Sequence, residues 1–315
     1  MQAGVVDVDA LLTALTSLQG VLVSISLVAM MAAMGTQLTQ GDIRKTIRES
    51  NLVARWILAN LLAVPLFAIL VGVLFNLSDP TLVALLLVAI APGAPFIPQL
   101  VALAGENSHE AVRLTAALTL VATLTVPLLV AAALAVLQIE LVFPAWRLVV
   151  PLLVVLVIPL VAGGVVQNRR PGLANALGKR LVTLSNAALL VALGIVAVLD
   201  VGRTVRVFTG LAGTGILLVM ALFVFASIEI GWLIGGPTAQ NRRLLALGTA
   251  GRNVNIALFI ATGAFPGSNA DETILAFTMI MIVTSVLVAL YWRRRSVTGG
   301  SPQADHEQGS ETGQQ

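Results

Sequence analysis

Residues 85–100 read LLLVAIAPGAPFIPQL, an apolar run that is interrupted by three prolines and a glycine. Each proline removes an amide donor and clashes with the preceding helical turn, at a cost of about 3 kcal/mol or more. Backbone groups that are freed at membrane depth need a wet cavity or surrounding protein. A single proline would indicate a kinked helix. Three prolines within this short stretch predict a membrane helix over 81–104 that is unwound in its middle.

Residues 244–258 read LLALGTAGRNVNIAL and form a second interrupted stretch. Two glycines, an arginine and two asparagines lie inside an otherwise apolar segment, and a charge at mid-bilayer costs about 2.5 kcal/mol or more. Placing Pro92 on Ala250 also places Leu100 on Leu258. The two predicted spans run in opposite directions, and paired broken helices in inverted halves are typical of a transporter's binding site.

Composition places the whole chain in the membrane. Of its 315 residues, 58% are hydrophobic and only 10% are charged, against about 25% charged in a soluble domain. The absence of cysteine excludes disulfides, thiolate metal sites and cysteine nucleophiles. The first ten residues carry Asp7 and Asp9 but no basic residue, so they do not resemble a secretory signal. We therefore expect an all-α integral membrane protein.

Hydropathy predicts nine spans, at 16–38, 52–75, 81–104, 111–137, 146–166, 180–199, 210–234, 244–264 and 272–292. Fourteen of the 18 lysines and arginines then fall on one side, against Arg147, Arg203 and Arg206 on the other. The positive-inside rule puts the C-terminus in the cytoplasm and the N-terminus outside. The basic pI is thus an orientation signal, and nucleic acid is not an expected partner. The expected parts are an extracytoplasmic N-terminus (1–15), a transporter domain (16–292) and a disordered cytoplasmic tail (293–315), in the plasma (inner) membrane.

Several local motifs resemble the bile acid:sodium symporter family over residues 16–292. They are Ala91-Pro92-Gly93, Leu103-Ala104-x-x-Asn107, Leu114-Thr115 to Pro127-Leu128-Leu129, Met34-Gly35-x-x-Leu38 before Asp42, and Asn253. The resemblance implies nine or ten spans in two inverted repeats, divided into a panel domain and a core domain. Two discontinuous helices would cross in the core. It also implies transport of bile acids or other organic anions, including small carboxylates, usually driven by sodium.

The sodium ligands implied by the resemblance are mostly missing. The family's Ser-Asn pair after the Pro-Gly turn falls on Ile97 and Pro98, the shared glutamate on Gly248, and the nearby glutamine on Arg252. A serine becomes Ala111. The ion-site positions that follow from this transfer are Asn60, Thr115, Gly248, Thr249 and Gly251. We expect no resident cofactor, and a site that has lost its carboxylate should bind sodium poorly.

The replacement of glutamine by Arg252 suggests a fixed positive charge that pairs directly with an anionic solute. Sodium-independent transport of an organic anion or amphipathic solute is therefore predicted. In a competing interpretation, Arg252 is satisfied by carbonyls of the third span or by Glu229 and only braces the crossing. The predicted solute-binding residues are Pro92, Gly93, Pro95, Pro98, Gln99, Arg252, Asn253 and Asn255.

Other functions remain open at this stage. A sodium- or proton-coupled symporter with a rearranged ion site, and a transport-inactive sensor or scaffold, are both compatible with the residues. A membrane enzyme is disfavoured because no His/Asp/Glu cluster or nucleotide loop lies in the spans. Thr115, Thr119 and Thr123 recur at helical spacing, which favours helix packing over ligand contact.

Overall fold

A computed structural model describes residues 8–136, 146–199, 201–265 and 268–298, and these residues form helices without a β-strand. Segment η1 is a π-helical turn within a longer helix. The elements are α1 (Val8–Gln37), α2 (Gln40–Arg48), α3 (Ser50–Ile57), η1 (Leu58–Ala63), α4 (Val64–Leu74), α5 (Asp79–Ile90), α6 (Ile97–Leu103), α7 (Ser108–Val136), α8 (Trp146–Arg169), α9 (Pro171–Leu199), α10 (Val201–Gly213), α11 (Ile216–Ile234), α12 (Ala239–Ala250), α13 (Val254–Ala264) and α14 (Ala270–Thr298).

The membrane-spanning character predicted from hydropathy is confirmed. Seven helical segments in the described part of the chain are long and apolar enough to cross a bilayer. The shorter apolar helices α5 and α13 each belong to an interrupted pair, α5 with α6 and α12 with α13. Large apolar side chains are exposed on the outer faces of α4, α8, α11 and α14, where a bilayer would cover them. Seven continuous and two interrupted spans agree with the predicted nine.

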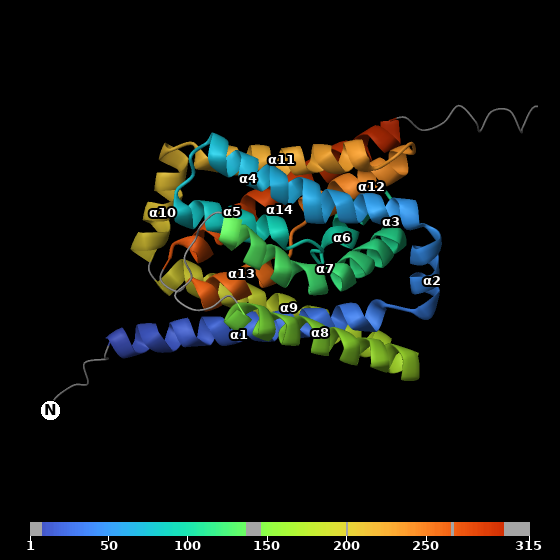
Figure 1. The fold of residues 1–315 in the computed structure, drawn as a ribbon, viewed down its shortest axis with the longest axis horizontal. Coiled ribbons are helices and arrows are strands. Elements are labelled where there is room, and N and C mark those ends of the chain that lie inside the picture. The colour runs from blue at the N-terminus through green and yellow to red at the C-terminus, as the bar shows by residue number, and fades with distance from the viewer. Residues whose placement is uncertain (1–7, 137–145, 200, 266–267, 299–315) are drawn as a thin grey trace, which may run out of the picture.

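The helices form two layers (Figure 1). Helix α1 packs along both α8 and α9, and these three helices form one layer, the panel. The other layer, the core, contains α3–α7 and α11–α14. Within the panel, a side chain on Gly35 would collide with the backbone of α8, and one on Gly163 with that of α1. Glycine at both positions therefore lets the two backbones touch.

The order of elements repeats along the chain. A panel helix, a long core helix, an interrupted pair and another long core helix occur first as α1, α3–α4, α5–α6 and α7. The same order recurs as α9, α11, α12–α13 and α14. This arrangement matches the two repeats that the family resemblance implies.

One end of the molecule collects α2, the starts of α3, α7 and α12 and the ends of α8 and α14, at the right of Figure 1. We call it the basic end, because Lys45, Arg113, Arg169, Arg243 and Arg295 lie on these segments. The start of α1 and helix α10 lie at the opposite end. The predicted alternation of basic residues therefore corresponds to a physical end of the fold.

Some predicted boundaries differ from the structure. The span predicted at 210–234 begins only at Ile216, because Gly215 adopts a left-handed φ of 73° and separates α10 from α11. The sixth span begins at Pro171 instead of 180, since the helix continues beyond its apolar part. Helix α14 runs to Thr298, so the start of the predicted tail is helical. Residues 1–7 and 299–315 lie outside the described residues.

Candidate functional site

The first interruption separates α5 from α6. Helix α5 ends at Ile90 and α6 begins at Ile97, with Pro98 in the first turn of α6, where a missing amide hydrogen is tolerated. Gly93 has a φ of 85°, and a Cβ there would lie 2.7 Å from Thr119 Oγ1 on α7. The predicted unwinding is confirmed from Pro92 to Phe96, whereas Pro98 is helical; Gly93 is required both by its backbone angle and by its contact with α7.

The second interruption separates α12 from α13. Residues Gly251 and Asn253 have extended backbone, with ψ values of 113° and 91°. A Cβ on Gly251 would lie 2.5 Å from Ile97 Cγ1 of the first interruption. The glycine therefore allows the two unwound segments to touch at one point.

At that point the two segments are bonded through their backbones. Pro92 and Arg252 form an isolated antiparallel β-bridge. The Asn253 amide donates to the Ala91 carbonyl oxygen at 2.7 Å. The predicted crossing is thus a short two-stranded contact inside the core, which satisfies part of the backbone that unwinding exposes.

Arg252 is fully buried at the crossing, with 1% of its surface exposed. Its Nη1 donates to the Ala89 carbonyl oxygen at 3.2 Å, near the C-terminal end of α5, where a positive charge is favoured. Its Nε and Nη2 have no hydrogen-bond partner, and no carboxylate in the described part of the chain pairs with it. The prediction that Glu229 could satisfy Arg252 is wrong, because Glu229 is exposed on α11 whereas Arg252 is buried.

Two asparagines begin α13. Asn253 is the residue before its first turn, is completely buried, and has no hydrogen-bond partner for either side-chain polar atom. The first amides of α13 and the positive end of its dipole lie at the same place. Asn255 is turned instead toward the panel, where its Oδ1 accepts from Ser26 Oγ at 2.5 Å. The crossing therefore offers a buried cation, free amides and an unpaired side-chain amide.

The position that the resemblance assigns to an anionic sodium ligand is filled by a neighbouring ring. Gly248 is packed against the indole of Trp56, and a Cβ on Gly248 would collide with that ring. Trp56 is itself buried, and its carbonyl oxygen accepts from Asn60 Nδ2 at 3.0 Å. Asn60 lies in the π-helical turn that precedes Pro65. A carboxylate would not fit at residue 248 without displacing Trp56.

The remaining predicted positions are dispersed. Thr249 donates to the Ser227 carbonyl oxygen at 2.7 Å, so its side chain joins α12 to α11. Thr115 is buried, and its Oγ1 has no partner. Gln99 is exposed, and its amide nitrogen donates back to the Pro95 and Phe96 carbonyl oxygens. Pro95 and Pro98 are half-buried, and whether any of these residues binds a ligand stays a prediction.

A cavity of about 650 Å³ opens between panel and core at the end opposite the basic end. Its panel side comes from α1 and α8, and its core side from α13 and the start of α14. The lining is largely apolar, with hydroxyl groups, Gln19, Arg147 and Asp271 as its polar members. Gln19 is 3% exposed, and its Nε2 has no hydrogen-bond partner. Gln19 was not among the residues predicted from the sequence, although an amide side chain inside the first predicted span, 16–38, was a signal for it.

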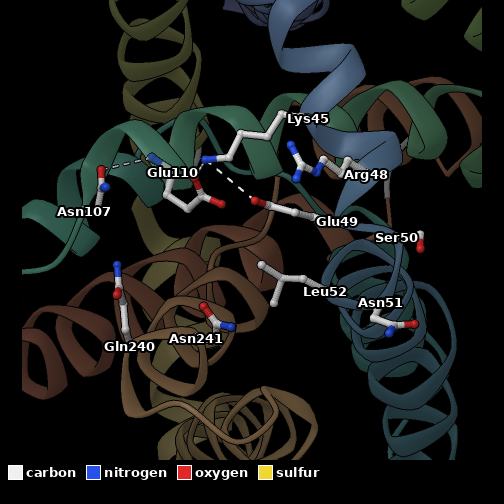
Figure 2. A pocket seen from close by; sticks show the side chains of 10 residues that line it. All are labelled: Lys45, Arg48, Glu49, Ser50, Asn51, Leu52, Asn107, Glu110, Gln240 and Asn241. Atoms are coloured by element: carbon white, nitrogen blue, oxygen red, sulfur yellow. Dashed lines mark hydrogen bonds and ion pairs between the residues drawn. The ribbon is translucent and has the colours of Figure 1, made fainter.

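A second cavity, of about 500 Å³, lies at the basic end where α2, α3, α7 and α12 meet (Figure 2). Lys45 pairs there with Glu49 and, at 3.0 Å, with Glu110. Both carboxylates also pair with buried Arg113 behind the cavity. Gln240 and Asn241 of α12 form the facing wall. Lys45 and Arg113 are thus paired with Glu49 and Glu110, and these ion pairs connect the elements around the cavity.

Comparison with known proteins identifies the family to which the chain belongs. The profile described as "Sodium Bile acid symporter family" matches residues 24–207, more than half of the chain. The chain belongs to this family. One curated relative is the "Probable sodium/metabolite cotransporter BASS4, chloroplastic" of Arabidopsis thaliana. It is 28% identical over 212 residues, which cover 61% of this chain and 48% of that protein.

The comparison has clear bounds. The chain spans about half the length of the curated relative that it matches. The family match contains the first interruption and ends before the second, so residues 248–255 lie outside it. The description of the matched profile names symporters, which are membrane transport proteins.

Proposed function

We propose that this protein carries an organic anion or amphipathic acid across the plasma membrane by alternating access, without sodium. The observation that carries the proposal is Arg252, a buried guanidinium at the crossing with two unpartnered nitrogens and no carboxylate partner in the described chain. An uncompensated charge at that depth is costly unless an anion neutralises it during the transport cycle.

Two further features bear on the chemistry of the solute. The N-terminal amides of α13 add a positive partial charge beside Asn253 at the crossing. The cavity between panel and core is largely apolar, with hydroxyl groups and Gln19 among its polar members, which suits a molecule with an apolar body and a polar group. Arg252 itself does not line this cavity. In the proposed cycle the solute reaches it when the panel and core move apart.

Sodium is disfavoured by the side chains around residue 248. Hard cations are held by several oxygen ligands, commonly including a carboxylate. Gly248 provides none, and the indole of Trp56 fills the adjacent space. A fixed guanidinium in the core would supply the positive charge that a bound sodium ion otherwise supplies.

The orientation belongs to the same proposal. By the positive-inside rule the basic end is cytoplasmic, so α14 ends inside the cell and α1 begins outside. The cavity between panel and core is then open to the outside. The conformation described here corresponds to an outward-facing carrier.

A second candidate is a sodium-coupled symporter with a rearranged ion site. The Arabidopsis relative is named a probable sodium/metabolite cotransporter. Three buried oxygens, Thr115 Oγ1, Asn60 Oδ1 and Asn253 Oδ1, have no hydrogen-bond partner and could contribute to such a site. The two candidates differ in what drives transport.

Uptake into proteoliposomes tests both candidates. The purified protein would be assayed with a panel of radiolabelled monocarboxylates and bile salts, under an inward gradient of NaCl or of KCl. We expect uptake of at least one acid at equal rates in both salts. Stimulation by the sodium gradient alone would favour the second candidate. No uptake of any acid above protein-free vesicles would contradict the carrier.

A further inference from the structure

The panel and core are joined at mid-membrane by a hydrogen bond that involves Ser26. This serine is buried on α1 of the panel, and its Oγ lies 2.5 Å from Asn255 Oδ1 of the core. The same Oγ lies 2.8 Å from the Ser185 carbonyl oxygen on α9, within the panel. Ser185 in turn donates to the Ser26 carbonyl oxygen at 2.8 Å.

Ser26 Oγ also lies 3.0 Å from Ser185 Oγ, so its one hydrogen has three acceptors within reach, two of them on Ser185. If the bond to Asn255 breaks, the hydroxyl can turn to the Ser185 carbonyl oxygen and leaves no buried donor unpaired. Only Asn255 then lacks a partner, which a solute group or water must supply. The contact can thus open at low cost on the panel side and exposes a polar group on the core side.

The contact lies directly beneath the cavity between panel and core. The helices α1 and α13 run in opposite directions there, and residues seven apart share a helix face. Moving from Ser26 toward the cavity leads to Gln19 on α1, and moving from Asn255 leads to Thr262 on α13. Both Gln19 and Thr262 line the cavity. The same two faces are therefore separated by a cavity at one level and hydrogen-bonded at the next.

We propose that the Ser26–Asn255 hydrogen bond is the gate between the outward cavity and the crossing, with Gln19 as the solute's first polar contact on the panel. The unpartnered Nε2 of Gln19 donates to an oxygen of the solute. The solute then displaces Ser26 from Asn255, and Ser26 turns to Ser185. This inference rests on the proposed transport cycle, because it describes how a solute enters the crossing.

The gate can be tested without knowing the solute. Because the chain has no cysteine, Asn253→Cys introduces a single thiol just beyond the gate, at a side chain that has no hydrogen bond to lose. A membrane-impermeant maleimide is applied from the side on which the cavity opens. We expect Ser26→Ala to raise the labelling rate of Asn253→Cys about tenfold, the effect of losing roughly one buried hydrogen bond.

Ser24→Ala is the matched control. Ser24 lies on the same helix and lines the cavity, but its hydroxyl donates to the Gly20 carbonyl oxygen of its own helix. We expect labelling at the unmodified rate in this background. Equal rates in the Ser26→Ala and Ser26 backgrounds would overturn the gate, and so would equal acceleration by Ser24→Ala.

The readout separates this inference from the proposed function. If no acid is transported but Ser26→Ala accelerates labelling, the gate stands and the carrier proposal fails. If an acid is transported but labelling does not respond to residue 26, the gate fails alone. A parallel labelling of Thr262→Cys, which already lines the cavity, should be fast in every background and reports that the fold is intact.

Discussion

Arg252 is the residue on which the transport proposal depends most directly. Replacing it by glutamine removes the charge and keeps a polar side chain. We expect uptake of the transported acid to fall at least about tenfold in Arg252→Gln, as when one charged partner of a desolvated pair is lost. Arg252→Lys should retain part of the activity, because it keeps the charge without the planar fork.

The control for Arg252 is Arg243→Gln, which removes an arginine of the preceding helix α12 that pairs at the basic end with Glu106, 2.8 Å away. Its uptake should stay close to that of the unmodified protein. Both variants are compared by radiolabelled uptake at matched amounts of folded protein. Unchanged uptake and unchanged salt dependence in Arg252→Gln would mean that the arginine only braces the crossing.

Gly248 provides a second test at the residue scale. A Cβ added there collides with the ring of Trp56, so Gly248→Ala should destabilise the protein by about 1–3 kcal/mol and lower its Tm. Gly194→Ala on α9 has nothing within 4 Å of the added Cβ and should be neutral or slightly stabilising. Combining Gly248→Ala with Trp56→Ala should remove the clash. Equal Tm values for the two glycine variants would contradict the filled site.

Among the elements, α2 is the link that connects the panel helix α1 to the core. It is tied to α7 by Arg113, which pairs with Glu49 and Glu110, and by Lys45, which contacts the same two carboxylates. The only non-helical residues between α1 and α2 are Leu38 and Thr39. Helix α2 is therefore expected to move with the core, and the chain to bend at these two residues.

Removing the centre of this ion-pair network should loosen the link. We expect Arg113→Met to lower the free energy of unfolding, and with it the Tm; the loss should be somewhat smaller than the about 3–5 kcal/mol typical of a fully buried pair that loses one partner. The reason is that Glu49 stays partly exposed to water. Exposed Arg48 on α2 gives the control Arg48→Met, which should change the Tm little. Thermal unfolding of the detergent-purified variants measures both, and an unchanged Tm for Arg113→Met would refute the role of the network.

The interrupted helices were predictable because proline and glycine act on the local backbone. Proline lacks an amide hydrogen-bond donor, and glycine can adopt positive φ angles. The sequence also indicated that carbonyls of the third span could satisfy Arg252, and the bond to the Ala89 carbonyl oxygen bears this out for Nη1 but not for Nε and Nη2. The inward face of a helix was harder to predict where polar residues are neighbours. Asn186 is exposed, whereas Ser185 is buried against Ser26 of α1, because adjacent residues differ by about 100° around the helix. Long-range partners such as Trp56 for Gly248 depend on how helices pack, which no local pattern contains.

At the scale of the whole molecule, the orientation can be measured directly in a chain without cysteine. Thr214 is exposed at the end opposite the basic end, and Gly172 is exposed near the start of α9, at the basic end. An impermeant maleimide should label Thr214→Cys in intact cells, and Gly172→Cys only after the cells are opened. The reverse pattern would place the cavity between panel and core on the cytoplasmic side.

The backbone bridge between Pro92 and Arg252 has an electrical consequence. A co-transported sodium ion leaves the protein together with the solute. A guanidinium that is fixed in the core stays in the protein and returns with the core when the empty carrier resets. Each turnover with a monovalent acid then transfers one net negative charge, worth about 2.3 kcal/mol per 100 mV of membrane potential. Potassium diffusion potentials set with valinomycin should therefore accelerate uptake into liposomes that are positive inside and slow it when the sign is reversed. In a cell that is negative inside, the resting potential would favour release of the acid.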